Sequence, residues 1–203
     1  MQKSRFSTAL GWFTTALIAA LISVTASAQE IPTKQQAASL QVFGLFSYVQ
    51  PHYYPSNNNG ISFGADLNFR PLSVIQPSLE LRATFAPGSD VSEHTYNFGP
   101  RVELNLNRIR PYAFAFIGKG YITFAHPVIY PTGPYSHDDS TVFSGGAGVD
   151  YLLTPRIGLR ADIMLQRWNL GGGATTTIFH PRLYSVGADY RFDFNRPHFH
   201  RHR

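Results

Sequence analysis

The chain has 203 residues and no cysteine, and it combines 14% aromatic residues with only 14% charged residues. Its formal net charge of +5 arises from Lys3 and Arg5 at the start and from Arg196, Arg201 and Arg203 at the end. The body is therefore neutral, which argues against nucleic-acid binding, and the lack of cysteine excludes disulfides and lipid attachment through a thiol. So few charges with so many aromatic residues are unusual for a soluble domain and are typical of strands that face lipid.

Residues 1–28 are predicted to form a secretory signal peptide. Lys3 and Arg5 precede a mainly apolar run from Leu10 to Val24, and the small residues Ala26-Ser27-Ala28 fit a cleavage site. The alternative is a membrane-anchoring helix, but the apolar run is shorter than the roughly 20 residues that spanning requires. Residues 29–38 are then expected to be a short polar leader in the periplasm.

Between residues 39 and 194, apolar and polar residues alternate in segments of about ten residues, as in SLELRATF at 78–85. A period of two predicts β-strands with unlike faces, and here the polar face carries ions of both signs. We therefore predict an all-β fold, an eight-stranded antiparallel up-and-down transmembrane β-barrel with lipid outside and a polar, ion-paired interior. The strands are expected at 39–50, 60–70, 77–86, 94–107, 111–124, 140–153, 156–169 and 181–194.

The connections predict which way the barrel is oriented. If the N-terminus is periplasmic, segments 51–59, 87–93, 125–139 and 170–180 face outward, whereas the turns at 108–110 and 154–155 are short and face inward, as usual for such barrels. Both termini are then periplasmic. Lipid-facing aromatic residues are expected in two girdles, one of Phe69, Tyr112, Tyr151, Phe192 and Phe194, the other of Phe63, Phe85, Tyr96, Phe98, Phe124, Phe143 and Tyr184. Both faces of the first strand are apolar, so its facing stays open.

The inward face is predicted to carry seven acids and six bases. These structural lumen ions are Asp66, Arg70, Glu80, Arg82, Arg101, Glu103, Lys119, Asp150, Arg160, Asp162, Asp189, Arg191 and Asp193. An eight-stranded barrel is only wide enough inside for side chains, so these ions must pair with one another. We expect a salt-bridged plug rather than a catalytic or conducting cluster. Six glycines on the same face would give the long side chains room, namely Gly64, Gly99, Gly146, Gly148, Gly158 and Gly187.

Residues 195–203 are predicted to form a solvated basic tail. Its His198, His200 and His202 could bind zinc, copper or nickel weakly, but nothing fixes their geometry and the neighbouring arginines repel a dication. The sequence therefore predicts no metal site and no cofactor.

Four segments resemble one known family. FGPRVEL at 98–104, NRIRPYAFAFIG at 107–118, GGAGVDYLLTPRIGLRAD at 145–162 and VGADYRFDF at 186–194 are similar to the small outer-membrane β-barrel proteins of the OmpA-transmembrane-domain, OmpX and porin-like opacity type. The resemblance covers essentially the whole mature chain and implies a bacterial outer membrane, with lipid and lipopolysaccharide as surroundings. It also implies that Tyr190, Phe192 and Phe194 form the terminal signal that the barrel assembly machinery reads.

The expected function is non-enzymatic, either structural or in surface interaction, and the outward loops are the candidate binding site for an extracellular ligand. A first alternative is a narrow channel or a carrier of small molecules. A second is a lipid-A-modifying enzyme, since barrels of similar size include acyltransferases and deacylases that use His, Ser and an acid. Ser136, His137, Asp138 and Asp139 have suitable chemistry, but adjacency along a loop is no triad geometry, so no catalytic residue is predicted.

Overall fold

The computed structural model describes residues 38–51, 57–130, 133–170 and 177–192. The predicted signal peptide, nearly all of the leader and the basic tail lie outside these ranges, as do Asp193 and Phe194. None of the described residues forms a helix that is both long enough and apolar enough to cross a bilayer.

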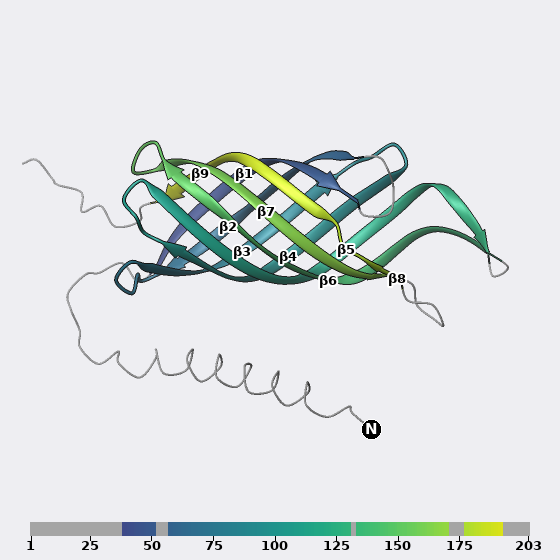
Figure 1. The fold of residues 1–203 in the computed structure, drawn as a ribbon, viewed down its shortest axis with the longest axis horizontal. Coiled ribbons are helices and arrows are strands. Elements are labelled where there is room, and N and C mark those ends of the chain that lie inside the picture. The colour runs from purple at the N-terminus through teal and green to yellow at the C-terminus, as the bar shows by residue number, and fades with distance from the viewer. Residues whose placement is uncertain (1–37, 52–56, 131–132, 171–176, 193–203) are drawn as a thin grey trace, which may run out of the picture. The chain divides into compact units, whose positions relative to one another are not determined.

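The described residues form one closed sheet of nine strands (Figure 1). The strands are β1 (Ala38–Gln50), β2 (Asn58–Phe69), β3 (Ile75–Ala86), β4 (Val91–Leu104), β5 (Ile109–Tyr130), β6 (Gly133–Leu152), β7 (Ile157–Leu170), β8 (Thr177–Phe179) and β9 (Arg182–Phe192). Every pairing is antiparallel, and the ring closes where β9 pairs with both β1 and β7. The short β8 also pairs with β7, so β8 and β9 share the eighth crossing. The predicted eight-stranded barrel is therefore confirmed.

One predicted loop is wrong. Residues 125–139 were expected to be an irregular outward connection, but β5 runs on to Tyr130 and β6 begins at Gly133. The two strands pair to the tip through a register shift between Thr123 and Val128. Figure 1 shows this hairpin reaching well past the ends of the other strands. We call the part from Ala125 to Ser136 the long hairpin, and the end of the barrel that carries it the hairpin rim.

The opposite end, which we call the terminal rim, holds the first residue of β1, the last of β9 and three short connections. Two of these are tight turns, closed by the pairs Leu72 with Ile75 and Leu106 with Ile109. Ser73 and Asn107 adopt φ values of 60° and 57° there, a left-handed conformation that two-residue hairpin turns require. The terminal rim thus carries short turns, as the sequence predicted, whereas parts of three connections at the hairpin rim lie outside the described residues.

Burial alternates along the strands, as in β7, where each buried residue is followed by an exposed one. The exposed positions are largely apolar and include Phe63, Leu81, Phe98, Phe143 and Ile163, which suits a surface that faces lipid. The facing of the first strand, which the sequence left open, is now determined. Gln41, Phe43, Leu45, Ser47 and Val49 point inward.

The predicted facing of β5 is reversed. Tyr112 was expected to face lipid, but it is buried in the lumen, and Phe124 packs against an interior apolar cluster. The reason is the turn before the strand, which consists of Asn107 and Arg108 rather than residues 108–110, so that Arg101 pairs with Phe114. Such a register shift moves every side chain of a strand to the other face.

Candidate functional site

The lumen beside the terminal rim holds the densest group of ionisable side chains. Nine of the thirteen predicted lumen ions are buried there, namely Asp66, Glu80, Arg82, Arg101, Glu103, Asp150, Arg160, Asp162 and Asp189. Arg191 is half-buried beside them, and Asp193 lies outside the described residues. We call the buried group, together with Arg110 and Arg191, the ion cluster.

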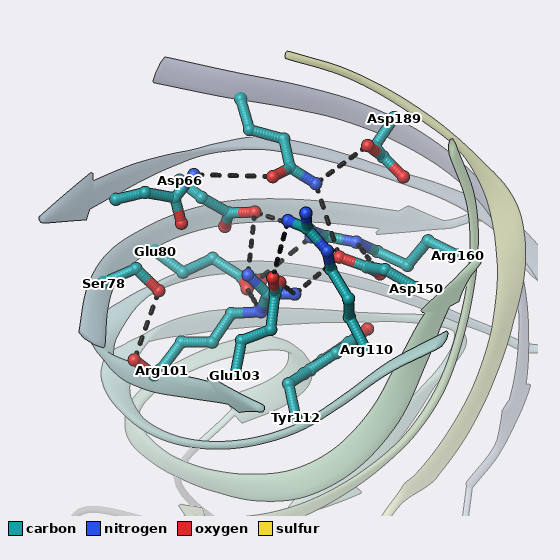
Figure 2. A network of polar contacts seen from close by, with 12 residues as sticks. Asp66, Ser78, Glu80, Arg101, Glu103, Arg110, Tyr112, Asp150, Arg160 and Asp189 are labelled. Atoms are coloured by element: carbon teal, nitrogen blue, oxygen red, sulfur yellow. Dashed lines mark hydrogen bonds and ion pairs between the residues drawn. The ribbon is translucent and has the colours of Figure 1, made fainter. Parts of the chain in front are cut away.

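Arg101 and Arg160 form the centre of the ion cluster (Figure 2). Arg101 Nη2 lies 2.6 Å from Asp150 Oδ2, and Arg160 contacts the other oxygen of that carboxylate, with 3.0 Å between Nε and Oδ1. Asp66 bridges the same two arginines, at 2.6 Å from Arg160 and 3.5 Å from Arg101. Each carboxylate is therefore shared, so that removal of one arginine leaves at least two buried acids short of a partner.

Arg82 forms a second branch toward the middle of the barrel. Its Nε lies 2.7 Å from Glu80 Oε1, and its Nη2 lies 2.7 Å from Asp162 Oδ2. The Tyr112 hydroxyl donates to that same Asp162 oxygen at 2.9 Å. Glu80 also faces Arg101 and Arg160, each at 3.7 Å, and joins the two branches.

Aromatic rings cover the faces of the guanidinium groups. Arg101 Cζ lies 4.0 Å from the centre of the Tyr112 ring, and Arg160 Cζ lies 4.3 Å from that of Phe43. Arg82 Cζ lies 5.2 Å from the centre of the Phe43 ring and 5.0 Å from that of Phe114. Cation–π contacts of this kind strengthen where water is excluded. The aromatic residues of β5 thus line the lumen in contact with the arginines.

The glycines on the inner face make room mainly for these rings. A Cβ at Gly64 would approach Phe43 Cζ to 2.6 Å, and one at Gly146 would approach Phe114 Cζ to the same distance. A Cβ at Gly148 would likewise approach Tyr112 Cζ to 2.6 Å. The sequence had predicted that these positions accommodate charged chains. Gly64 and Gly146 face rings instead, whereas the Asp162 side chain is as close to Gly148 as the Tyr112 ring is, and Gly158 faces Asp189.

Two of the predicted lumen ions do not belong to the cluster. Arg70 follows β2 and is exposed at the terminal rim. Lys119 lies on the outer face of β5, where its ammonium group pairs with Asp139 on β6 and both side chains remain more than half exposed. The sequence prediction assigned Lys119 to the lumen because the facing of all of β5 was reversed. Its cross-strand partner on β4 is the outward-facing Tyr96.

Sequence reasoning also missed members of the site. Gln41 donates to Asp189 at 2.9 Å and accepts from Arg191 Nη2 at 2.9 Å, but the first strand had no assigned facing. Arg110 donates to Glu103 at 3.1 Å, and it was assigned to a turn. Correct pairing of β4 with β5 would have identified both Arg110 and Tyr112, because cross-strand partners share a face.

The lumen is filled beyond the ion cluster as well. A hydroxyl layer crosses the barrel, with 2.7 Å from Ser47 to Ser62, 2.8 Å from Ser62 to Thr84 and 3.0 Å from Ser47 to Ser185. Nearer the hairpin rim comes an apolar cluster of Val91, Ile122, Val142, Trp168 and Leu170, with Phe124 and Phe179 packed against it. Three successive layers of side chains therefore lie along the interior.

The residues with catalytic chemistry lie on the hairpin side, away from the ion cluster. Ser136 Oγ is 3.3 Å from His137 Nδ1, but both are sequence neighbours at the surface, and the Asp139 carboxylate accepts from Lys119 instead of orienting the imidazole. Across the described residues, no three His, Cys, Asp or Glu side chains are grouped to hold a metal ion. The three tail histidines lie outside those ranges.

At the end of β9, Tyr190 and Phe192 face outward and make an edge-to-face contact, with their ring centres 4.9 Å apart. Phe194, the third member of the predicted assembly signal, lies outside the described residues. The alternating aromatic pattern is thus present in β9, and its recognition by assembly factors stays a prediction.

Comparison with solved structures finds the same fold in small barrels of low sequence identity. Ail, the attachment invasion locus protein of Yersinia pestis, superposes with a TM-score of 0.50 at 16% identity over 76% of this chain and 97% of that one. A major outer membrane protein of Thermus thermophilus superposes with a TM-score of 0.50 at 11% identity, over 77% of this chain and 100% of that one. Neisserial surface protein A superposes with a TM-score of 0.49 at 15% identity, over 77% of this chain and 98% of that one. No curated protein sequence matches the chain.

A family model matches most of the sequence. The model of the outer membrane protein beta-barrel domain aligns with residues 14–192, which include every described strand. Together with the closed eight-crossing barrel, the apolar outer face and the ion-paired lumen, this match shows that the chain belongs to the outer-membrane β-barrel family.

Proposed function

We propose that this protein is a non-enzymatic barrel whose wall anchors it in the outer membrane and whose long hairpin contacts partners outside the cell. One observation carries the proposal. Inside the wall, the ion cluster, the hydroxyl layer and the apolar cluster follow one another toward the hairpin rim, whereas the long hairpin extends β5 and β6 far beyond their neighbours. Among the described residues, the long hairpin is therefore the part that reaches furthest beyond the wall.

The filled lumen favours an anchor over the alternative of a channel or carrier. A solute would have to displace the shared Asp66 and Asp150 pairs, which leaves buried charges without partners, and then the apolar cluster around Trp168. Both barriers lie on the same path. A carrier would need a cavity inside the wall, where arginine, aromatic and hydroxyl side chains are already packed.

The proposed orientation places the terminal rim in the periplasm and the hairpin rim at the cell surface. Short turns at one end and long connections at the other support this orientation. Lipid and lipopolysaccharide then surround the apolar outer face, and the assembly machinery reads the aromatic pattern of β9. The likeness to Ail carries the fold alone, so the proposal rests on the hairpin and the lumen.

The test removes the long hairpin and keeps the barrel. Residues 125–135 are replaced by Asn-Gly, which suits a two-residue turn that continues the pairing of Thr123 with His137. Cells that display the full chain, the shortened chain or no barrel are applied to printed arrays of glycans and extracellular matrix proteins. We expect the full chain to bind at least one printed class above the empty strain, and the shortened chain to lose that signal.

Lys119→Met is the matched control, because it removes an exposed ion pair next to the hairpin and leaves the hairpin itself intact. It should bind as the full chain does. Binding that survives removal of the hairpin would overturn its proposed role, and equal signals from cells with and without the full chain would overturn the surface-interaction function.

A further inference from the structure

The terminal rim contains a cavity of about 290 Å³ that the proposed function does not use. It lies where the start of β1, the end of β9, the end of β2 and the connection between β6 and β7 meet. Its lining includes Ser39, Asn68, Phe69, Arg156, Arg191 and Phe192. The cavity therefore has a polar side with two guanidinium groups and an aromatic side.

The backbone holds the two arginines next to each other. Arg191 N donates to Arg156 O at 2.8 Å, across the junction between β9 and the connection that precedes β7. Arg191 is also anchored through Nη2 on Gln41. The Nε atoms of both arginines are buried and have no hydrogen-bond partner within the described part of the chain. The two residues therefore lie side by side where the cavity is lined by their chains.

The charge of the terminal rim has one sign. Arg70, Arg108, Arg110, Arg156 and Arg191 are all exposed or half-buried there. Among the described residues of this rim, the acids, such as Glu103, are buried within the ion cluster. An anion that approaches this end of the barrel consequently meets five arginines and no exposed carboxylate from these ranges.

The aromatic side of the cavity places it at the membrane surface. Phe69 and Phe192 line the cavity and are also 38% and 37% exposed on the lipid-facing wall. Aromatic residues at the ends of transmembrane strands lie at the level of the lipid headgroups. A phospholipid whose chains run along the wall beside these rings would thus bring its phosphate to Arg156 and Arg191.

We propose that this cavity binds the phosphodiester group of an anionic phospholipid. Guanidinium groups present paired N–H donors that match phosphate oxygens. A lipid with a net negative charge is preferred over a zwitterionic one, because the cationic headgroup of the latter would face the arginine-rich rim. The inference is independent of the long hairpin, which lies at the other rim.

The experiment measures lipid retention by native mass spectrometry on the purified full chain in detergent micelles. Phosphatidylglycerol and phosphatidylcholine with identical acyl chains are added in equal amounts. We expect phosphatidylglycerol to be retained on the order of tenfold over phosphatidylcholine, and Arg156→Gln to lower that ratio about fivefold. The double variant Arg156→Gln/Arg191→Gln should abolish the preference.

The matched control is Arg167→Gln/Arg182→Gln, which removes two exposed arginines from the hairpin side and causes the same change in net charge. It should keep the preference. Heat resistance on a gel checks that each variant is folded, and Arg156→Gln spares the ion cluster if the double variant fails this check.

Three results would overturn the proposal. The first is an equal loss of preference in the control pair, which would show general electrostatic attraction. The second is displacement of the bound lipid by an equal concentration of inorganic phosphate, which would show a site for the free ion. The third is a preference that arises only in a chain that ends at Phe194, which would show that the protein's own tail fills the cavity.

Discussion

Arg101 lies where ion pairs from four strands meet, since its partners are Asp66, Glu80, Glu103 and Asp150. Arg101→Ala leaves these acids with fewer partners in a space from which water is excluded. We expect a loss of about 3–5 kcal/mol in the free energy of unfolding, measured by urea titration in micelles, and a lower temperature at which the folded band disappears on a gel.

Lys119→Met is the control for the loss of unfolding free energy expected in Arg101→Ala. Its pair with Asp139 is exposed, so we expect the free energy of unfolding to change by no more than about 0.5 kcal/mol. If Arg101→Ala unfolded at the same urea concentration as Lys119→Met, the ion cluster would have no structural role.

Adjacent glycines in β6 test the inner face in the same way. A Cβ at Gly146 would lie 2.6 Å from Phe114 Cζ and still closer to the backbone oxygen of Ile163. Gly146→Ala should therefore destabilise the barrel by about 1–3 kcal/mol in urea titration. Gly145→Ala faces lipid, with its closest neighbour at 3.8 Å, and should be neutral or slightly stabilising. Equal effects of the two variants would contradict the assigned facing of β6.

At single positions, the alternation of the sequence predicted most of the buried ions, because each lies on a strand whose other face is clearly apolar. It failed where that contrast is absent. In β5 both faces contain apolar residues, and Phe114 and Phe116 are more hydrophobic than the alanines that actually face lipid. The energy of stacking guanidinium groups on rings inside the barrel cannot be seen in a one-dimensional pattern.

At the level of strands, the turn between β4 and β5 decided the facing of β5. Asn107 is a residue type that tolerates positive φ, and with Arg108 it makes a two-residue turn. A three-residue turn at 108–110 would pair Arg101 with Ile117 instead of Phe114, an odd change of register that reverses the facing of the strand. Turn chemistry was thus the signal in the sequence that would have placed Tyr112 and Lys119 correctly.

The long hairpin is the element that the sequence described least well. Its Pro, Gly and Tyr residues are typical of loops, yet its two strands keep pairing without neighbours on either side. Because the ring of eight crossings closes below it, we expect the chain with Asn-Gly in place of residues 125–135 to fold. Its urea midpoint should match that of the full chain, and failure to form the heat-resistant band would show that the hairpin is needed for closure.

For the molecule as a whole, the layered lumen predicts the absence of steady conductance. Purified protein in a planar bilayer should show no regular current steps, because the shared ion pairs and the apolar cluster lie in series. Arg101→Ala combined with Trp168→Ala removes one large side chain from the ion cluster and one from the apolar cluster, and serves as the comparison. Regular steps from the unmodified protein would contradict the filled lumen.

Fold class and crossing number follow from whole-chain periodicity, which tolerates errors in single strands, whereas the family was indicated by the resemblance of four segments. The course of the chain beyond the barrel wall cannot be predicted from periodicity, because neither the long hairpin nor the terminal cavity has a repeating sequence pattern. Such features depend on which strand ends meet, as Arg156 and Arg191 do through one backbone hydrogen bond.

The seam between β1 and β9 has a consequence for the order of assembly. It joins residues as distant in sequence as Leu40 and Phe192, and the two strands complete a lumen whose charges come from both halves of the chain. Asp66 and Arg101 emerge early during synthesis, whereas Asp150 and Arg160 emerge late. An unfinished sheet would carry unneutralised ions into the hydrocarbon. The chain is therefore expected to stay outside the bilayer core until its last strand is available, so that insertion and closure occur together.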